Sequence, residues 1–340
     1  MASEIEVDRS ATIYDVAKAA GVAPSTVSRT FSRPGRVSSR TAQRVREVAQ
    51  SLGYRTDPVY RPAPRAFSRV IALAVADLTD PAFFGVVRGA EQAATRAGYT
   101  LLLVEAHESA RIERDLFERT APIVDGLVIT SSRLSDTELR TLAKTLPVVV
   151  VNRHVGGLPS IIPDSSRGVR RALEHLGELG HERIAYISGS DTSWADGVRW
   201  RATREAALEL SLSEVRLGPV PATVRGGEMI ANEFLASGAT AALAYNDLIG
   251  LGLMRALRDR GLRLPEDVSI IGFDNIFASD LVSPALTTVA APMGALGEAS
   301  VNHIITTLSR GAPTRSGAMV VPVRLLVRES TARAPRHEQK

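Results

Sequence analysis

Residues 12–31 constrain this chain most, because they have the pattern of two short amphipathic helices around a tight turn. Thr12 is followed three residues later by Asp15, which is typical of a capping box at a helix start. Gly21 supplies the left-handed residue that a tight turn needs, and Pro24 stands where the next helix accepts proline. The pattern predicts a helix-turn-helix.

The second expected helix carries a polar face. Its exposed side offers short polar groups and one guanidinium, at Ser25, Thr26, Ser28 and Arg29. Such a face can enter a major groove of DNA. A small three-helix cap without a DNA role shares parts of this pattern, so the segment that follows decides between the two interpretations.

A third helix is expected after Ser38, which can cap a helix over Thr41 to Leu52 that Gly53 ends. Apolar residues recur on one face of this helix, at Val45, Val48, Ala49 and Leu52. Three helices of this length would close a small core. This spacing indicates that residues 11–56 form a DNA-binding headpiece.

The charge of the chain is concentrated in this headpiece and the segment after it. Residues 1–70 hold twelve Lys or Arg against six Asp or Glu, whereas the remaining 29 basic and 31 acidic residues nearly cancel. A solvated basic face is the simpler explanation for an isolated cluster. Because this cluster coincides with the helix-turn-helix, we interpret it as a surface for phosphate contact.

The composition bounds the remaining possibilities. A chain of 340 residues, 44% hydrophobic and 23% charged, has length for two or three domains with ordinary cores. It has no cysteine, which excludes disulfides, thiolate metal sites and cysteine nucleophiles. The first residues lack the apolar core of a signal peptide, and no apolar run approaches about 18 residues. We therefore expect a cytoplasmic protein with no membrane partner.

From Thr12 to Tyr54 the sequence resembles the headpiece of the LacI/GalR family of bacterial repressors. The resemblance continues to about residue 330 through motifs in the family's order: Asp80-Pro81-Ala82-Phe83, Val124-Asp125-Gly126-Leu127, Leu179-Gly180-His181-Glu182-Arg183-Ile184-Ala185, Asn246-Asp247, Gly272-Phe273-Asp274-Asn275 and Pro284-Ala285-Leu286-Thr287-Thr288-Val289. With the polar face described above, it implies these DNA-contacting residues: Thr12, Tyr14, Pro24, Ser25, Thr26, Ser28, Arg29, Ser32, Arg36, Ser38, Thr41 and Arg61.

Beyond a Pro- and Arg-rich linker over residues 57–69, apolar runs alternate with helical stretches. Buried strands are expected at Val70–Ala76, Thr100–Glu105, Gly126–Thr130, Val148–Asn152, Arg183–Ser188, Glu214–Pro219, Ala241–Ala244, Val268–Phe273 and near Met319–Val327. Repeated βα units predict two doubly wound parallel-sheet subdomains over residues 70–332.

The resemblance implies that this α/β core is periplasmic-binding-protein-like, with chain crossovers near Pro163, Ala291 and Val320. The first subdomain would then hold residues 70–163 and 292–319, and the second residues 164–291 and 320–332. A ligand in such a core should lie between the subdomains, at the carboxyl ends of the strands.

Polar and aromatic residues at these strand ends are the candidates for effector binding. They are Phe83, Thr130, Asn152, Trp194, Arg199, Asn246 and Asp274. Arg199 is expected at a strand-to-helix junction, and it matches the family's effector-binding arginine; a surface arginine that caps a loop is its alternative. Asp247 is expected to cap the helix after it. Core packing is the alternative for Phe83, and Asn152 replaces a frequent Asp of relatives, which argues against a simple galactoside-like ligand.

These residues favour a ligand-responsive transcriptional regulator, most simply a repressor, that binds a near-palindromic operator as a homodimer; a tetramer stays open. The effector expected is a sugar or sugar derivative, with a nucleoside or purine as the other possibility. A solute-binding protein or an enzyme with the same cleft is the alternative function. The sequence shows no paired nucleophile and base, metal set or Walker loop, so we expect no catalysis, metal or cofactor.

The linker departs from the family pattern. Relatives form a short hinge helix on DNA and insert a leucine into the minor groove, and Ala63 stands at the position of that leucine. If Asp57 capped such a helix, Pro62 would be its fifth residue and would cost about 3 kcal/mol. Pro64 adds a second break.

We therefore predict that residues 57–66 stay extended or irregular on the operator, with Arg61 and Arg65 contributing electrostatic contacts. The operator should bend less than it does with relatives. Circular-permutation gel shifts measure this bend. A sharp central bend, or a complex with a regular helix across Pro62, would contradict the prediction.

Overall fold

The computed structural model describes residues 11–32, 35–52, 54, 67–310 and 317–335. The chain forms two compact units, Met1–Ala66 and Phe67–Lys340. Residues 57–66 of the expected linker, including Arg61, and Gly53 lie outside the described residues. Among the described helices, none has both the length and the apolar composition needed to span a membrane.

The first unit is a three-helix headpiece of α1 (Ile13–Ala20), α2 (Pro24–Ser32) and α3 (Ser39–Ser51). Its caps confirm the local predictions. The backbone N–H and hydroxyl of Thr12 donate to the Asp15 carboxylate at 2.8 and 2.6 Å, and Gly21 has a φ of 63°. The Ser38 hydroxyl accepts from the backbone N–H of Thr41 at 3.3 Å.

Small side chains close the core of the headpiece. Its buried members are Val16, Ala17, Ala20, Val27, Val45 and Ala49. The expectation that Leu52 joins this core is wrong, since its side chain is 41% exposed. Leu52 is the C-cap of α3, where the helix has ended and no longer holds the side chain on the inner face.

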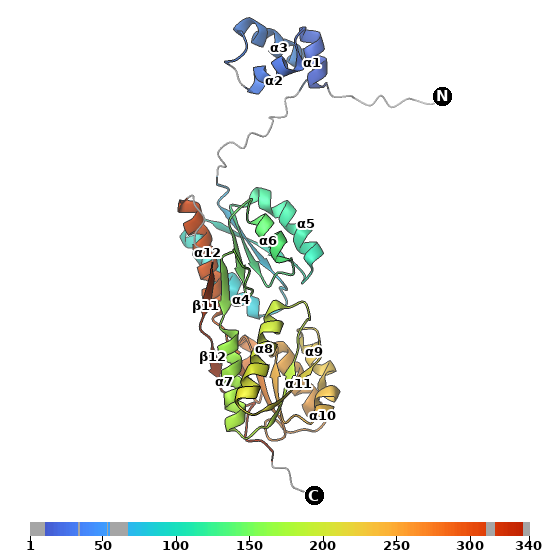
Figure 1. Ribbon diagram of the computed structural model, residues 1–340, viewed down its shortest axis with the longest axis vertical. Coiled ribbons are helices and arrows are strands. Elements are labelled where there is room, and N and C mark those ends of the chain that lie inside the picture. The colour runs from blue at the N-terminus through green and yellow to red at the C-terminus, as the bar shows by residue number, and fades with distance from the viewer. Residues whose placement is uncertain (1–10, 33–34, 53, 55–66, 311–316, 336–340) are drawn as a thin grey trace, which may run out of the picture. The chain divides into compact units, whose positions relative to one another are not determined.

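The second unit begins with a fully parallel six-stranded sheet in the order β11-β5-β4-β3-β1-β2. Its strands are β1 (Val70–Val75), β2 (Thr100–Glu105), β3 (Gly126–Thr130), β4 (Val148–Val151), β5 (Ser160–Pro163) and β11 (Ala318–Val321). Helices α4 (Ala82–Arg96) and α12 (Met293–Arg310) share one hydrophobic core with the sheet, and α5 (Ala110–Thr120) and α6 (Asp136–Leu142) share another (Figure 1).

A second six-stranded sheet has the order β12-β10-β9-β8-β6-β7. Its strands are β6 (Arg183–Ile187), β7 (Ser213–Leu217), β8 (Ala241–Ala244), β9 (Ser269–Phe273), β10 (Thr287–Ala290) and β12 (Arg324–Leu326). One core contains α7 (Ser165–Glu178) and α8 (Trp194–Glu209), and the other contains α10 (Ala231–Ser237) and α11 (Asp247–Asp259). Helix α9 (Val224–Met229) lies directly against α11, where a Cβ added at Gly227 would be 2.1 Å from the Ile249 carbonyl oxygen. Two doubly wound subdomains result.

The chain passes between the sheets three times: after β5, after β10 and between β11 and β12. The single final strand expected near Met319–Val327 is in fact two strands in different sheets. Pro322 separates them, because proline cannot continue a strand ladder. β12 runs antiparallel to β10, which departs from the all-parallel expectation. Both β5 and β10 are missing from the strands expected, because Ser160 and Pro163 in β5 and two threonines in β10 interrupt the apolar runs that marked the other short strands.

Helices α4 and α12 cross at very short distance beside these passages. A Cβ added at Gly89 would lie 2.0 Å from the carbonyl oxygen of Gly294, and one added at Gly297 would lie 2.1 Å from that of Val86. Only glycine permits such an approach. The crossing fixes the start of α12, where Met293 lines the space between the subdomains.

Candidate functional site

The exposed face of α2 carries the residues expected to contact DNA. Ser25, Ser28 and Arg29 are exposed, whereas Val27 and Thr30 are buried against the headpiece core. Thr26 is half-buried, and its carbonyl oxygen accepts from the Thr30 hydroxyl at 2.9 Å. Burial at positions three residues apart leaves one continuous polar face on this helix.

The remaining candidates of the headpiece lie around α2. Thr12, Pro24, Arg36 and Ser38 are exposed, Thr41 is half-buried, and Ser32 is the last residue of α2. Tyr14 is 70% exposed, which leaves its ring without a packing role. These residues stay predicted DNA contacts.

A cavity of about 120 Å³ lies between the two subdomains, at the carboxyl ends of the strands. Both subdomains line it, with residues that follow β1, β2, β3, β4, β6, β7, β8 and β9. The lining consists of Ala76, Asp77, Asp80, Ala82, Phe83, Glu108, Ser131, Asn152, Ser190, Arg199, Pro221, Ala222, Thr223, Tyr245, Asp274 and Met293. The candidates Phe83, Asn152, Arg199 and Asp274 are therefore brought together.

Arg199 is the buried charge of this cavity, with only 2% of the residue exposed. Its Nη2 lies 3.2 Å from Oδ1 of Asp274, and its Nη1 donates to the carbonyl oxygen of Tyr245. The guanidinium stacks 3.5 Å from the centre of the Phe273 ring. Its Nε has no hydrogen-bond partner. Arg199 lies inside α8 rather than at the expected junction, because α8 begins earlier, after its N-cap Ser193.

Carboxyl groups surround the guanidinium. Burial and the nearby charge of Asp274 raise the pKa of Asp80 from 3.8 to about 7. Burial also raises the pKa of Asp274, although the charge of Arg199 opposes this shift. With Asp77 and Glu108, four carboxyl groups line the cavity against one guanidinium. Carboxyl groups therefore outnumber guanidinium groups in the lining.

The backbone is strained where the strands end at this cavity. Ser131, Asn152 and Asp274 have φ values of 48°, 60° and 99°, in the left-handed region that side chains rarely adopt. The side-chain amide of Asn152 donates to the Ser131 hydroxyl at 3.0 Å. The strained residues hold polar side chains toward the space that both subdomains share.

Asn246 takes the capping role expected of Asp247, and neither side chain lines the cavity. Asn246 is the N-cap of α11: its Oδ1 accepts from the Ile249 N–H at 3.0 Å, and its Nδ2 donates to the Ala222 carbonyl at 3.2 Å. These bonds occupy the side chain, which does not line the cavity. Asp247 instead lies buried and accepts hydrogen bonds from the Ile276 N–H and the hydroxyls of Ser279 and Thr288.

Two further candidates do not line the cavity. The Thr130 hydroxyl donates to the Ala74 carbonyl at 3.0 Å, so it serves the sheet, and Trp194 is half-buried at the start of α8. Phe83 lines the cavity from α4 rather than from a strand end. The acidic residues Asp77, Asp80 and Glu108 were missed, although they follow the first two strands and their position could have indicated them.

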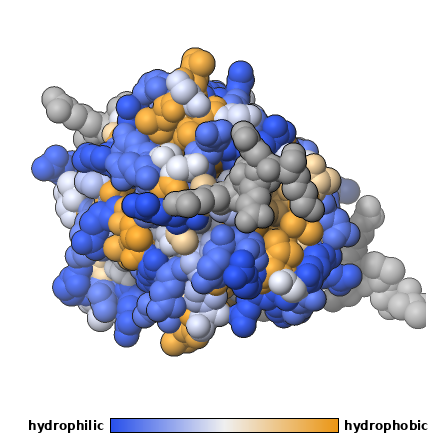
Figure 2. Space-filling view, turned by 90° about the horizontal axis from the view of Figure 1, so that it is seen from below, coloured by the Kyte–Doolittle hydropathy of each residue, from blue (hydrophilic) through white to orange (hydrophobic). Residues whose placement is uncertain are grey.

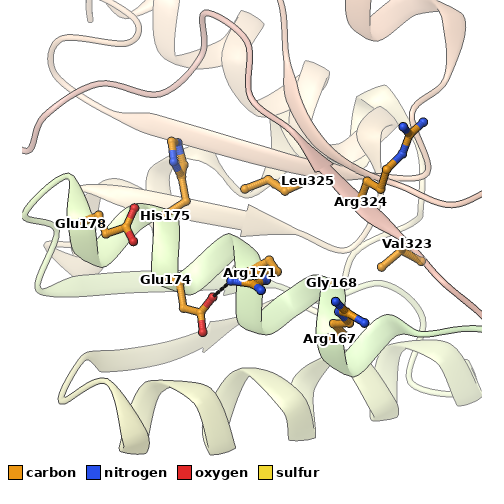
Figure 3. A pocket seen from close by; sticks show the side chains of 9 residues that line it. All are labelled: Arg167, Gly168, Arg171, Glu174, His175, Glu178, Val323, Arg324 and Leu325. Carbon is orange, nitrogen blue, oxygen red and sulfur yellow. Dashed lines mark hydrogen bonds and ion pairs between the residues drawn. The ribbon is translucent and has the colours of Figure 1, made fainter.

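A larger groove of about 490 Å³ lies elsewhere, between α7 and the edge strand β12 (Figure 3). It is lined by Arg167, Gly168, Arg171, Glu174, His175, Glu178, Val323, Arg324 and Leu325. Arg171 donates to Glu174 at 2.9 Å within it. All its residues belong to the second subdomain, away from the strand ends that meet the first sheet. The smaller cleft is therefore the better candidate for a ligand that affects both subdomains.

Two histidines of the second subdomain, His181 and His175, make structural contacts with hydroxyl groups. The buried His181 contacts the hydroxyls of Thr240 and Ser269 at 2.8 and 2.9 Å, which agrees with the structural hydrogen bonds expected for it. His175 contacts the Thr331 hydroxyl at 3.0 Å. In the part of the chain that the structure describes, no three His, Asp or Glu side chains form a metal-binding group.

Comparisons with known proteins agree with this architecture. Residues 12–57 match the family of bacterial regulatory proteins, lacI family, and residues 173–331 match a periplasmic binding protein-like domain. The HTH-type transcriptional regulator DegA of Bacillus subtilis is 30% identical over 331 residues, with 94% of this chain and 98% of DegA covered.

Solved structures of regulators are also similar. The lac repressor dimer bound to operator and the anti-inducer ONPF matches with a TM-score of 0.72 and 27% identity, over 95% of this chain and all of that one. The transcriptional regulator CelR in complex with cellobiose matches with a TM-score of 0.70 and 28% identity, over 94% of this chain and 99% of that one. The protein belongs to the LacI family and is a DNA-binding transcriptional regulator.

The raised pKa of Asp80 makes a prediction about stability. Between about pH 4 and pH 7 the folded protein holds a proton on Asp80 that the unfolded chain releases, so stability falls as pH rises through this window. Asp80→Asn keeps an oxygen for the Ala82 N–H and removes the charge. It should melt higher than the parent above pH 7, by an equivalent of about 1–3 kcal/mol.

Near pH 4 the two proteins should melt alike, because Asp80 of the folded parent is then protonated. Thermal unfolding at both pH values measures the difference. Asp247 also has a raised pKa and is present in both proteins, so its contribution cancels. A difference that does not change with pH would contradict the assignment.

Proposed function

We propose that this protein is a repressor that binds a near-palindromic operator as a homodimer, and that a small molecule in the cleft between the subdomains controls its affinity for DNA. The observation that carries this proposal is the presence, in one chain, of a helix-turn-helix and a two-subdomain cleft built around Arg199 and Asp274. A ligand that prefers one arrangement of the subdomains would shift operator affinity by its differential affinity for the two states.

This function needs no chemical step. The alternative of an enzyme or a solute-binding protein lacks support, because neither explains a DNA-binding headpiece on the chain. We place the protein in the cytoplasm, where its operator DNA would be found. A single headpiece offers few base contacts, so two copies on symmetric half-sites supply the specificity.

An exposed apolar surface of the second subdomain suits a second copy. Phe277 and Leu281 are 64% and 77% exposed, and close to them in sequence Val282 lines a hollow with Leu251 and Met254. The hydrophobic side chains on one face of the molecule gather in separate patches among hydrophilic ones (Figure 2). Patches of this kind mark protein contacts. The similarity to the lac repressor dimer supports this choice of partner.

The DNA-binding part of the proposal predicts the behaviour of Arg29→Ala. An exposed arginine on the recognition helix can read a base edge, so its loss should weaken specific operator binding by about 1–3 kcal/mol. Binding to non-specific DNA at the same salt concentration should weaken much less. Arg46→Ala is the control, because it removes an exposed guanidinium from α3 and should affect both DNAs alike. Equal losses for Arg29→Ala would refute base reading.

The acidic lining favours an uncharged polyhydroxylated effector. Carboxylates accept hydrogen bonds from hydroxyl groups, and Arg199 with its unpartnered Nε can donate to a ring or hydroxyl oxygen. Phe83 offers an apolar surface for a sugar ring or a base. A phosphate or carboxylate would meet Asp77, Asp80 and Glu108. We therefore propose a neutral sugar, as the cellobiose complex of CelR suggests, with a nucleoside as the second choice.

A thermal-shift screen tests the effector. Neutral sugars and nucleosides are compared with their phosphates, because a bound ligand raises the melting temperature by mass action. We expect stabilisation by a neutral member and none by its phosphate. Asp274→Asn should abolish this stabilisation, whereas Arg171→Ala in the α7–β12 groove should leave it intact. A ligand whose effect depends on Arg171 and not on Asp274 would refute the cleft as the effector site.

A further inference from the structure

Arg133 crosses the cleft between the subdomains. It follows β3 of the first subdomain, and its Nη2 lies 2.7 Å from Oε1 of Glu108 in the same subdomain. Its Nη1 donates to the Thr192 carbonyl of the second subdomain at 3.3 Å. The side chain is only 5% exposed. Among the described residues, no other side-chain hydrogen bond joins the two subdomains.

The loop that carries Arg133 is held firmly by its own subdomain. The buried Glu113 accepts from the Ser132 hydroxyl at 2.5 Å and from the Arg133 N–H at 2.8 Å. Arg153 donates to the carbonyls of Ser132 and Leu134 at 2.8 and 2.6 Å. The backbone of Arg133 is therefore fixed from two sides, so only the rotational freedom of its side chain is lost when it reaches across.

The receiving loop is also ordered, and it belongs to the cavity wall. The Thr192 hydroxyl contacts that of Ser190 at 3.0 Å, and Ser193 both caps α8 and contacts the Tyr245 hydroxyl at 3.1 Å. Ser190 and Tyr245 line the cavity, as does Glu108 on the other side of the bridge. The bridge thus connects two segments that shape the ligand space.

This arrangement works only while the cleft is closed. If the subdomains moved apart, Arg133 would keep Glu108 but lose the Thr192 carbonyl and gain water. In the closed form its Nε has no hydrogen-bond partner, which costs free energy that the bridge must offset. The bridge therefore favours the closed arrangement by only a small free energy. A switch between two subdomain arrangements requires such a small difference, because it must be reversible.

We propose that Arg133 is a positioning residue that holds the two subdomains closed over the cavity. The proposal rests on the proposed effector site. It adds a contact between protein groups, without the ligand, that sets the equilibrium between the open and closed arrangements. Its test needs no ligand, so its failure is distinguishable from a wrong effector assignment. The proposal also predicts that a folded variant without the guanidinium loses the preference for the closed arrangement.

The absence of native cysteines allows a direct distance measurement on the full chain. Glu118→Cys on α5 and Arg204→Cys on α8 place one exposed thiol on each subdomain for spin labels. Pulsed electron-spin resonance then gives the distribution of distances between the labels. The variants compared are the labelled parent, Arg133→Gln, Arg133→Lys and the control Arg114→Gln.

Arg114→Gln is a matched control, because Arg114 pairs with Glu138 at 2.6 Å within the first subdomain. We expect the Arg133→Gln distribution to become longer and broader than that of the parent, while Arg114→Gln overlays the parent. Arg133→Lys should lie between them, because an ammonium group cannot serve both partners with the planar fork of arginine. Circular dichroism verifies that each variant is folded.

Two results would overturn the proposal. One is that the distance distributions of both Arg133→Gln and Arg133→Lys overlay that of the parent. The other is an equal change in Arg133→Gln and Arg114→Gln, which would mean that the loss of any surface ion pair alters the distance. If Arg133→Gln does not fold, Arg133→Lys alone decides, with overlay on the parent as the refuting result.

Discussion

The cleft depends on the compensation of one buried charge. Arg199 has almost no contact with water, so its guanidinium needs the Asp274 carboxylate, the Tyr245 carbonyl and the face of Phe273. These partners follow or end neighbouring strands of one sheet, and Asp274 takes a left-handed backbone conformation. A buried ion pair is a poor source of stability. Its cost is consistent with the ligand-binding role that we propose for this cleft.

The same constraint explains the unusual state of the neighbouring carboxyl groups. Asp274 is paired with Arg199, but Asp80 of the opposite subdomain is buried and faces Asp274, and the burial together with this charge raises the pKa of Asp80. Arginines therefore compensate Asp274 and Glu108, whereas no ion pair among the described residues compensates Asp77 or Asp80. A ligand rich in hydroxyl donors would relieve this imbalance, whereas an anion would increase it. The bridge from Arg133 to Thr192 counters the resulting repulsion between the two walls.

The fold gives these interactions their regulatory potential. The chain passes three times between two sheets, so the subdomains can move relative to each other without disturbing either core. Each sheet has its own hydrophobic clusters, and the headpiece has a separate one. Ligand contacts and subdomain closure can thus change while the helix-turn-helix remains folded. This separation of cores is what a ligand-controlled DNA-binding protein requires.

The sequence by itself determined the features of the headpiece that depend on neighbours in the chain. The capping box at Thr12, the turn at Gly21 and the helix start at Pro24 are local, and βα alternation predicts parallel sheets whose strand ends meet. Only the tertiary structure decided which strand-end side chains reach the cleft. Contacts with Ile276, Ser279 and Thr288 bury Asp247 and leave the cap of α11 to Asn246. Asp80 and Arg133 likewise gained their roles from residues of distant segments. Periodicity carries no information about such contacts, because burial and charge compensation arise only when the subdomains are assembled.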